Sequence, residues 1–201
     1  MPVSLNCSQP NVVAAKNVKD VNFKGAYQRT ENGTPYYKTN SGIKAGGVAA
    51  AFVALAAVKN FTRGFSAGIP NLALGLMSIG CGAIVDKIRN KKAAEKADMI
   101  REVGLKQAVL VDDSIEFTRT GRGYYHSKDG VKKGGLLGLA VGAIDALSIY
   151  LFDKEATRKA FDSPKGKITG VVFSALIYGL GGLIMGKITD HLANNDARKN
   201  G

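Results

Sequence analysis

The residues that could carry chemistry are few, and the most unusual of them is Asp145. It is the only charged residue in the apolar stretch Gly134–Phe152. A carboxylate inside such a stretch is costly unless it is paired, so it marks either a proton or cation contact or a bond to a polar group on a neighbouring helix. For the second interpretation we consider Ser148, Tyr178 and Asn71 as partners.

No other set of residues has the spacing of a catalytic or metal site. His126 and His191 stand apart from the side chains that a metal would need beside them. The chain has no Walker loop and no Gly-x-Ser-x-Gly motif, and Gly121–Gly123 is better explained as a turn. Cys7 lies in a polar tail and Cys81 in an apolar block, so we expect no disulfide between them. We predict a protein that is not an enzyme and holds no metal or cofactor.

Small residues recur at the helical spacing of four. Residues four apart share a helix face, and small ones let two backbones approach closely in lipid. We interpret this pattern as helix packing within one molecule, and a glycine-lined oligomer or pore is the alternative. The predicted helix-packing residues are Gly75, Gly82, Gly134, Gly138, Gly142, Gly182 and Gly186.

One passage of the sequence occurs twice. Residues 30–47 align with residues 118–135, and both hold a Tyr-Tyr pair, a Gly-[Ile/Val]-Lys and a Gly-Gly in the same order. Further along, a longer offset aligns Asp86 with Asp190 and places an insertion within Asp153–Lys167 of the second copy. Self-similarity of this kind predicts two structural units of the same form.

Each copy continues into two apolar stretches, which makes four in the chain: 45–58, 64–85, 134–152 and 168–186. About 20 apolar residues cross the hydrocarbon core of a bilayer. The last three stretches are long enough, and the first needs its flanking residues and a partner helix. We therefore predict a mostly α fold, a four-helix membrane bundle from two tandem repeats, each a short β-hairpin followed by a glycine-rich helical hairpin.

The predicted units divide the chain into five parts, and the stretch 87–106 is expected to continue the second helix into water. The parts are a flexible polar tail (1–24), repeat 1 (25–92), a charged linker (93–113), repeat 2 (114–193) and a second tail (194–201).

Local signals predict where the elements turn and begin. Asn32-Gly33 favours a type I′ turn, in which both central residues have positive φ. We also expect the two β-hairpins to lie on one membrane face and to pair into one sheet. Ser41 and Asp129 are candidate N-caps of the first helix of each copy.

Two prolines are placed where a proline opens a helix. They are Pro70 and Pro164, which stand near the start of the second helix of each copy.

A tyrosine pair and a following lysine precede the first apolar stretch of each copy. Aromatic rings and lysines favour the level of the lipid headgroups, so we interpret these residues as interface anchors. A ligand or partner site made by the two β-hairpins is the alternative. The anchors are Tyr36, Tyr37, Tyr124, Tyr125, Lys44 and Lys132.

The chain is strongly basic, with a formal net charge of +12. This charge predicts attraction to a lipid bilayer with anionic headgroups. We expect no nucleic acid partner, because no recognised binding motif is present. The N-terminal, central and C-terminal segments hold 6, 12 and 3 of the 28 basic residues, and the two loops inside the helical hairpins hold 2 and 5. This distribution predicts that both termini are cytoplasmic.

In its number of helices and in its small-residue helix faces, the chain looks like the glycine-rich four-helix subunits of protein translocases. This likeness gives no functional role to any particular residue. We predict a small non-enzymatic integral membrane protein that acts as a scaffold or packing subunit, with homo-oligomers as one arrangement. The first alternative is an oligomeric pore, holin-like or transport element. The second is a soluble glycine-rich helical-hairpin protein.

Overall fold

The computed structural model describes residues 27–62, 64–152 and 163–200. The predicted N-terminal tail and residues 153–162 of the predicted insertion lie outside this part of the chain. The described elements are mostly helical. The helices are α1 (Ser41–Phe61), α2 (Phe65–Val103), α3 (Leu105–Val111), α4 (Asp129–Phe152) and α6 (Pro164–Asn200). The strands are β1 (Tyr27–Arg29), β2 (Pro35–Tyr37), β3 (Ile115–Phe117) and β4 (Gly123–Tyr125).

Four of these helices, α1, α2, α4 and α6, are long and apolar enough to cross a membrane. The predicted mostly α fold with four such helices and two short β-hairpins is confirmed. With 39 residues, α2 extends for about 58 Å, well beyond the roughly 30 Å of a bilayer core. Its second half is the charged stretch that follows Val85, so the predicted boundary at residue 92 lies inside this helix. The boundary at residue 193 likewise lies inside α6.

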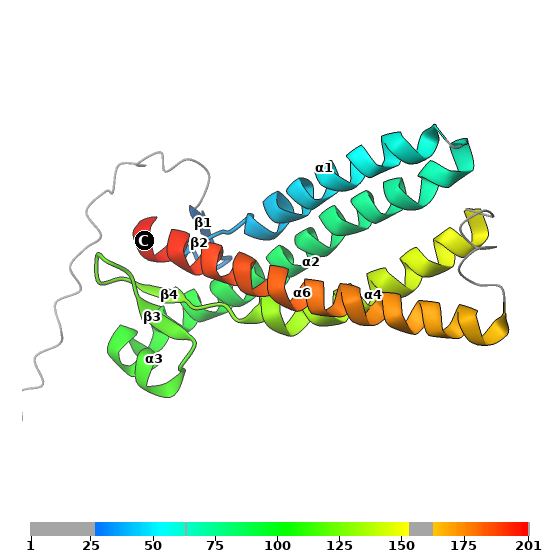
Figure 1. Cartoon of the computed structure of the whole chain (residues 1–201). Helices are drawn as coiled ribbons and strands as arrows, with labels where there is room; N and C mark the ends of the chain where they lie inside the picture. The colour runs from blue at the N-terminus through cyan, green and yellow to red at the C-terminus, as the bar shows by residue number, and fades with distance from the viewer. Residues whose placement is uncertain (1–26, 63, 153–162, 201) are drawn as a thin grey trace, which may run out of the picture.

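The long helices pack as two antiparallel hairpins, α1 against α2 and α4 against α6 (Figure 1). The two hairpins contact each other through α2 with α4 and through α1 with α6. Figure 1 shows the pairs spreading apart with distance from the β-hairpins, which lie at the end where α6 also ends.

The two β-hairpins form separate two-stranded sheets, so the prediction of one shared sheet is wrong. Tyr27 pairs with Tyr37 in the first sheet, and Ile115 pairs with Tyr125 in the second. Each sheet instead lies against the extended part of a long helix: β2 and β4 both contact α2, and β4 also contacts α6.

The predicted type I′ turn at Asn32-Gly33 is also wrong. Among the described residues only glycines have a positive φ, so Asn32 does not adopt the required conformation, whereas Gly33 does with a φ of 78°. The Gly33 amide donates to the Thr30 carbonyl at 2.9 Å, which gives a three-residue loop with glycine in the left-handed position. The Thr30 hydroxyl accepts the Thr34 amide at 3.1 Å and favours this form of the loop.

The second β-hairpin turns in the same way, two residues earlier than predicted, so that its loop shares only Gly121 with the predicted Gly-Arg-Gly. Gly121 has a φ of 81°, and its amide donates to the Thr118 carbonyl at 3.2 Å. The Thr118 hydroxyl accepts the Arg122 amide at 3.0 Å.

Of the two prolines, Pro164 opens α6 as predicted, whereas Pro70 does not open α2. That helix begins at Phe65, directly after Gly64, whose φ of 135° is open to glycine and strained for other residues. Pro70 therefore lies inside the helix, near its first turn.

Candidate functional site

A buried arginine lies where the two helical hairpins meet. The side chain of Arg89, in α2, belongs to a residue that is only 1% exposed. Its guanidinium donates to Asp86 in the same helix at 3.3 Å and to Asp190 in α6 at 2.8 and 3.1 Å. Both aspartates are buried too. One cation therefore joins an acid of the first helical hairpin to an acid of the second.

Three hydroxyl groups complete the surroundings of the guanidinium. It donates to Ser41 at the start of α1 (3.1 Å), to Thr189 in α6 (2.7 Å) and to Ser127 just before α4 (3.3 Å). The bonds reach α1, α6 and the residues that lead into α4, in addition to Asp86 on α2 itself. We refer to Arg89, Asp86, Asp190, Ser41, Ser127 and Thr189 as the Arg89 cluster.

Asp86 also binds the N-terminal end of α1. Its two carboxylate oxygens accept the amides of Gly42 and Ile43, both at 2.9 Å. The first amides of a helix have no partner within the helix and form its positive end, so a carboxylate is stabilised there. Ser41 does not cap α1 as predicted: its hydroxyl donates to the Thr189 carbonyl at 3.2 Å, and its amide donates to Thr39.

Asp190 binds the start of α4 in the same way. Its carboxylate oxygens accept the amides of Gly130 and Val131, both at 2.9 Å. The carboxylate of Asp129, predicted as the cap of α4, is instead bonded to the Tyr125 hydroxyl at 2.7 Å and to Lys92. Both predicted N-caps are therefore wrong, because each helix start is bound by an acid from the other helix of its hairpin.

Charge balance explains how this cluster is tolerated when buried. Two carboxylates contribute about −2, the guanidinium +1, and the two helix starts about +0.5 each. A buried charge is costly when it is unpaired, and here the sum is close to zero.

Two asparagines, each four residues after one of the buried aspartates, add a further pair of bonds to each helical hairpin. Asn90 exchanges two bonds with the main chain of Thr39, at 2.8 and 3.0 Å. Asn194 exchanges two bonds with the main chain of Ser127, at 2.8 and 2.9 Å. Arg89 has no such counterpart, because the alignment that pairs Asp86 with Asp190 places Ala193 at its position.

The predicted packing glycines lie inside the two helical hairpins. A Cβ atom on Gly134 would overlap with the Gly182 carbonyl, and the reverse substitution would overlap with the Gly134 carbonyl. Gly82, Gly138, Gly142 and Gly186 lie at similar close approaches of two backbones. At Gly75 the nearest atom would be 3.7 Å away, which is an ordinary contact.

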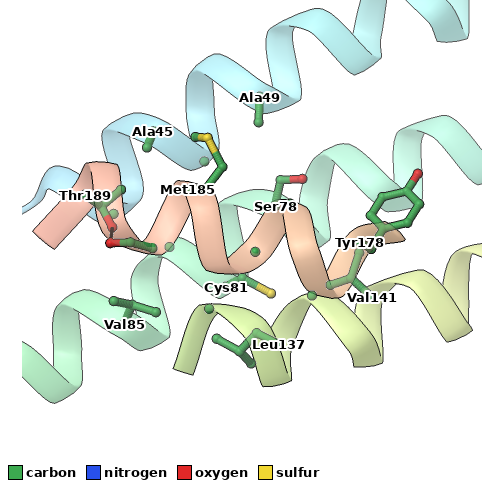
Figure 2. Close-up of a pocket in the computed structure, with 18 of the residues that line it drawn as sticks. Ala45, Ala49, Ser78, Cys81, Val85, Leu137, Val141, Tyr178, Met185 and Thr189 are labelled. Atoms are coloured by element: carbon green, nitrogen blue, oxygen red, sulfur yellow. Dashed lines mark hydrogen bonds between the residues drawn. The ribbon is translucent and has the colours of Figure 1, made fainter. Parts of the chain in front are cut away.

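Between the two helical hairpins lies an apolar groove of about 430 Å³, to which all four long helices contribute (Figure 2). Its lining is made mostly of small and aliphatic residues, among them Ala45, Ala49, Cys81, Leu137 and Val141. At one end it reaches Thr189 and the first glycines of α1 and α4, so the Arg89 cluster lies at that end.

Asp145 lies on α4 and is 6% exposed. Its carboxylate accepts the hydroxyl of Tyr178, which lines the groove, at 3.1 Å. Ser148 donates to the Asp145 main-chain carbonyl at 2.8 Å, whereas the Asn71 amide nitrogen has no hydrogen-bond partner within the described residues.

The predicted anchors lie at the β-hairpin end of the molecule. Lys44 and Lys132 are exposed, whereas Tyr124 is buried and Tyr125 is half-buried. Burial raises the pKa of Tyr124, and its bond to Glu116 at 2.6 Å raises it further. Tyr36 and Tyr37 are half-buried on β2, and the Tyr36 hydroxyl donates to Gln28 at 3.2 Å. Part of each tyrosine side chain is therefore packed within the β-hairpin end of the protein.

The two histidines lie apart. His126 contacts Glu116 at 2.8 Å, and His191 is exposed on α6. In residues 27–62, 64–152 and 163–200 no three His, Cys, Asp or Glu side chains are placed to hold a metal ion.

A pH-dependent ion pair fixes the loop after α3. Bonds from Lys96 and from the hydroxyl and amide of Ser114 lower the pKa of Asp112 from 3.8 to about 2. A lowered pKa means that the bonds stabilise the fold above pH 3.8 and lose this effect as the pH falls through about 2. We expect Asp112→Asn to destabilise the protein at pH 7 by about 1 kcal/mol after screening by water, and by almost nothing near pH 2.

Thermal unfolding of the detergent-solubilised wild type and variant from pH 7 to pH 2 measures this difference. A gap between the two melting temperatures that stays constant over that range would contradict the assignment.

No protein-family model matches the chain, and neither the curated proteins nor the solved structures contain a significant match to it.

Proposed function

We propose that this protein is a non-enzymatic integral membrane scaffold in which the Arg89 cluster holds two tandem helical hairpins together at one membrane face. The observation that carries the proposal is the position of Arg89, a buried cation bonded to acids of both helical hairpins. We infer that the hydrogen bonds of Arg89 hold the two helical hairpins together, because every other residue of the Arg89 cluster is also hydrogen-bonded within the protein.

Exposed apolar side chains on the long helices support the membrane part of the proposal. Phe52, Leu76, Phe173 and Leu180 are each more than 60% exposed, on α1, α2 and α6. Large apolar side chains exposed in such number are unfavourable in water and suit contact with lipid tails. These residues favour a membrane protein over a soluble glycine-rich one.

Matched hydrogen bonds support the tandem-repeat part. Asp86 and Asp190 bind the first amides of α1 and α4 with the same atoms and distances. Thr30 and Thr118 likewise make equivalent bonds in the two β-turns. Two copies of one unit in the same orientation place both β-hairpins on the same side, together with the extended ends of α2 and α6.

We place this side in the cytoplasm, with both termini, since it carries most of the basic residues. The lysines there would meet anionic headgroups.

A pore is the less favoured alternative. The groove between the helical hairpins is lined mostly by apolar residues, so a single molecule offers ions no polar path. A pore would need several copies.

Alkaline extraction and thiol labelling test the proposal. In a Cys7→Ser, Cys81→Ser background, Lys91→Cys introduces a thiol at a side chain that is 79% exposed, beyond the membrane-spanning part of α2. We expect the protein to stay in the membrane at high pH. We also expect a membrane-impermeant maleimide to label Lys91→Cys only when the cytoplasmic face is accessible.

Leu76→Cys is the control, because its side chain should be shielded by lipid from the same reagent. Release of the protein by alkali would overturn the membrane assignment, and labelling of Lys91→Cys from outside intact cells would reverse the orientation.

A further inference from the structure

We propose that one acyl chain of an anionic phospholipid occupies the apolar groove between the two helical hairpins. The inference rests on the proposed membrane function. The groove of about 430 Å³ is open to its surroundings and lies within the part of the helices that can cross a membrane. The medium that reaches it there is hydrocarbon.

The dimensions of the groove suit a single leaflet. Along α1 its lining runs from Gly42 to Val53, a rise of about 16 Å. Half of a bilayer core is about 15 Å thick. The groove therefore begins at the headgroup level, beside the Arg89 cluster, and ends near the middle of the bilayer.

Its interior has room for such a chain. Gly181 lines the groove, and a Cβ atom built on this residue would have nothing within 4 Å. Figure 2 shows Ala45 and Ala49 on α1 across from Met185 on α6, with Cys81, Leu137 and Val141 along the other side.

The charge at the headgroup end selects an anionic lipid. In residues 41–47, 82–90, 128–135 and 184–190 the acids are buried, and every exposed charged residue is a lysine. Lysines close to the surface attract anionic headgroups. They are Lys44, Lys87, Lys128, Lys132, Lys133 and Lys187.

Quenching by brominated lipid chains tests the proposal. Cys7→Ser protein is labelled at Cys81, inside the groove, with a small fluorophore and placed in nanodiscs with brominated-chain phosphatidylglycerol or brominated-chain phosphatidylcholine. We expect half-maximal quenching at a mole fraction of the anionic lipid that is about fivefold lower, which is the preference that one lysine near the surface provides.

Two matched leucine substitutions examine the groove itself. Gly181→Leu fills it, whereas Gly47→Leu adds the same side chain at another open glycine that does not line it. We expect Gly181→Leu to abolish the preferential quenching at Cys81 and Gly47→Leu to leave it unchanged.

The outcomes separate this inference from the membrane assignment. A label on the outward-facing Leu76→Cys, in a background without other cysteines, should be quenched by either lipid. If that label is not quenched, the membrane function itself fails. If it is quenched while Cys81 is not, or if both lipids quench Cys81 equally, the lipid site is wrong. A disulfide between the unlabelled Cys81 residues of two copies, formed under mild oxidation, would assign the groove to a second copy and also overturn it.

Discussion

Replacing Arg89 by methionine is expected to lower the free energy of unfolding by about 3–5 kcal/mol, the usual cost of removing one partner of a buried ion pair. The substitution leaves Asp86 buried with only the first amides of α1 as partners, and Asp190 with the first amides of α4 and the Ser127 hydroxyl. It also removes the buried cation that joins the two helical hairpins and leaves the partly exposed Lys92, which is bonded to Asp129, as a cation that links them. Equilibrium unfolding in mixed micelles measures the change.

The matched control is Lys91→Met, two residues further along α2. Its side chain is 79% exposed and forms one ion pair, at 3.9 Å with Glu95. Exposed pairs of this kind contribute less than about 1 kcal/mol, so we expect a change within about 0.5 kcal/mol. Equal effects of the two substitutions would show that the burial of Arg89 has no energetic consequence.

A double-mutant cycle separates the bridge from general packing. Asp190→Asn removes the charge to which Arg89 is bonded and keeps the shape of the side chain. If the pair acts as a unit, the combined Arg89→Met, Asp190→Asn variant is more stable than the sum of the single changes predicts. Strict additivity would mean that the two residues act independently.

Separation of the helical hairpins is the structural consequence of losing Arg89. Spin labels at Phe52→Cys in α1 and Phe173→Cys in α6, in a background without other cysteines, face outward on different hairpins. We expect the distance distribution between them to broaden in Arg89→Met and to stay narrow in Lys91→Met.

The long helices were predictable because their signal is local. The last three apolar stretches are long enough to predict a membrane-spanning helix from composition, whereas the first needs its flanking residues, and Val85 marks the point where charge begins. The capping of these helices was not predictable from neighbouring residues. Asp86 and Asp190 are 44 and 60 residues away from the glycines whose amides they accept.

Arg89 was missed for a similar reason. It lies in a stretch dense in basic residues, where a solvated helix face is the ordinary expectation, and no local pattern separates it from Lys87 or Lys91. One signal was available: the predicted repeat aligns Asp86 with Asp190 but aligns Arg89 with Ala193. The alignment shows two matched acids, Asp86 and Asp190, and a single arginine. That Arg89 lies between these two acids becomes apparent only when the two predicted copies are placed side by side.

The close approach of α4 and α6 requires glycine at position 182. The adjacent Gly181 provides a matched position for testing this requirement. A methyl group on Gly182 would overlap with the main-chain oxygen of Gly134, which cannot move unless α4 shifts. We expect Gly182→Ala to destabilise the protein by about 1–3 kcal/mol, as overpacking does. At Gly181 the same methyl group would meet nothing within 4 Å.

Gly181→Ala should therefore be neutral, or stabilising by up to about 1 kcal/mol through the better helix propensity of alanine. The two variants have the same composition and differ by one position on one helix, so hydrophobicity and helix propensity cancel in the comparison. What remains is the distance between two backbones. Equal stability of the two variants would mean that α4 and α6 do not approach closely at this point, and the packing interpretation of the small-residue spacing would then fail for this helical hairpin.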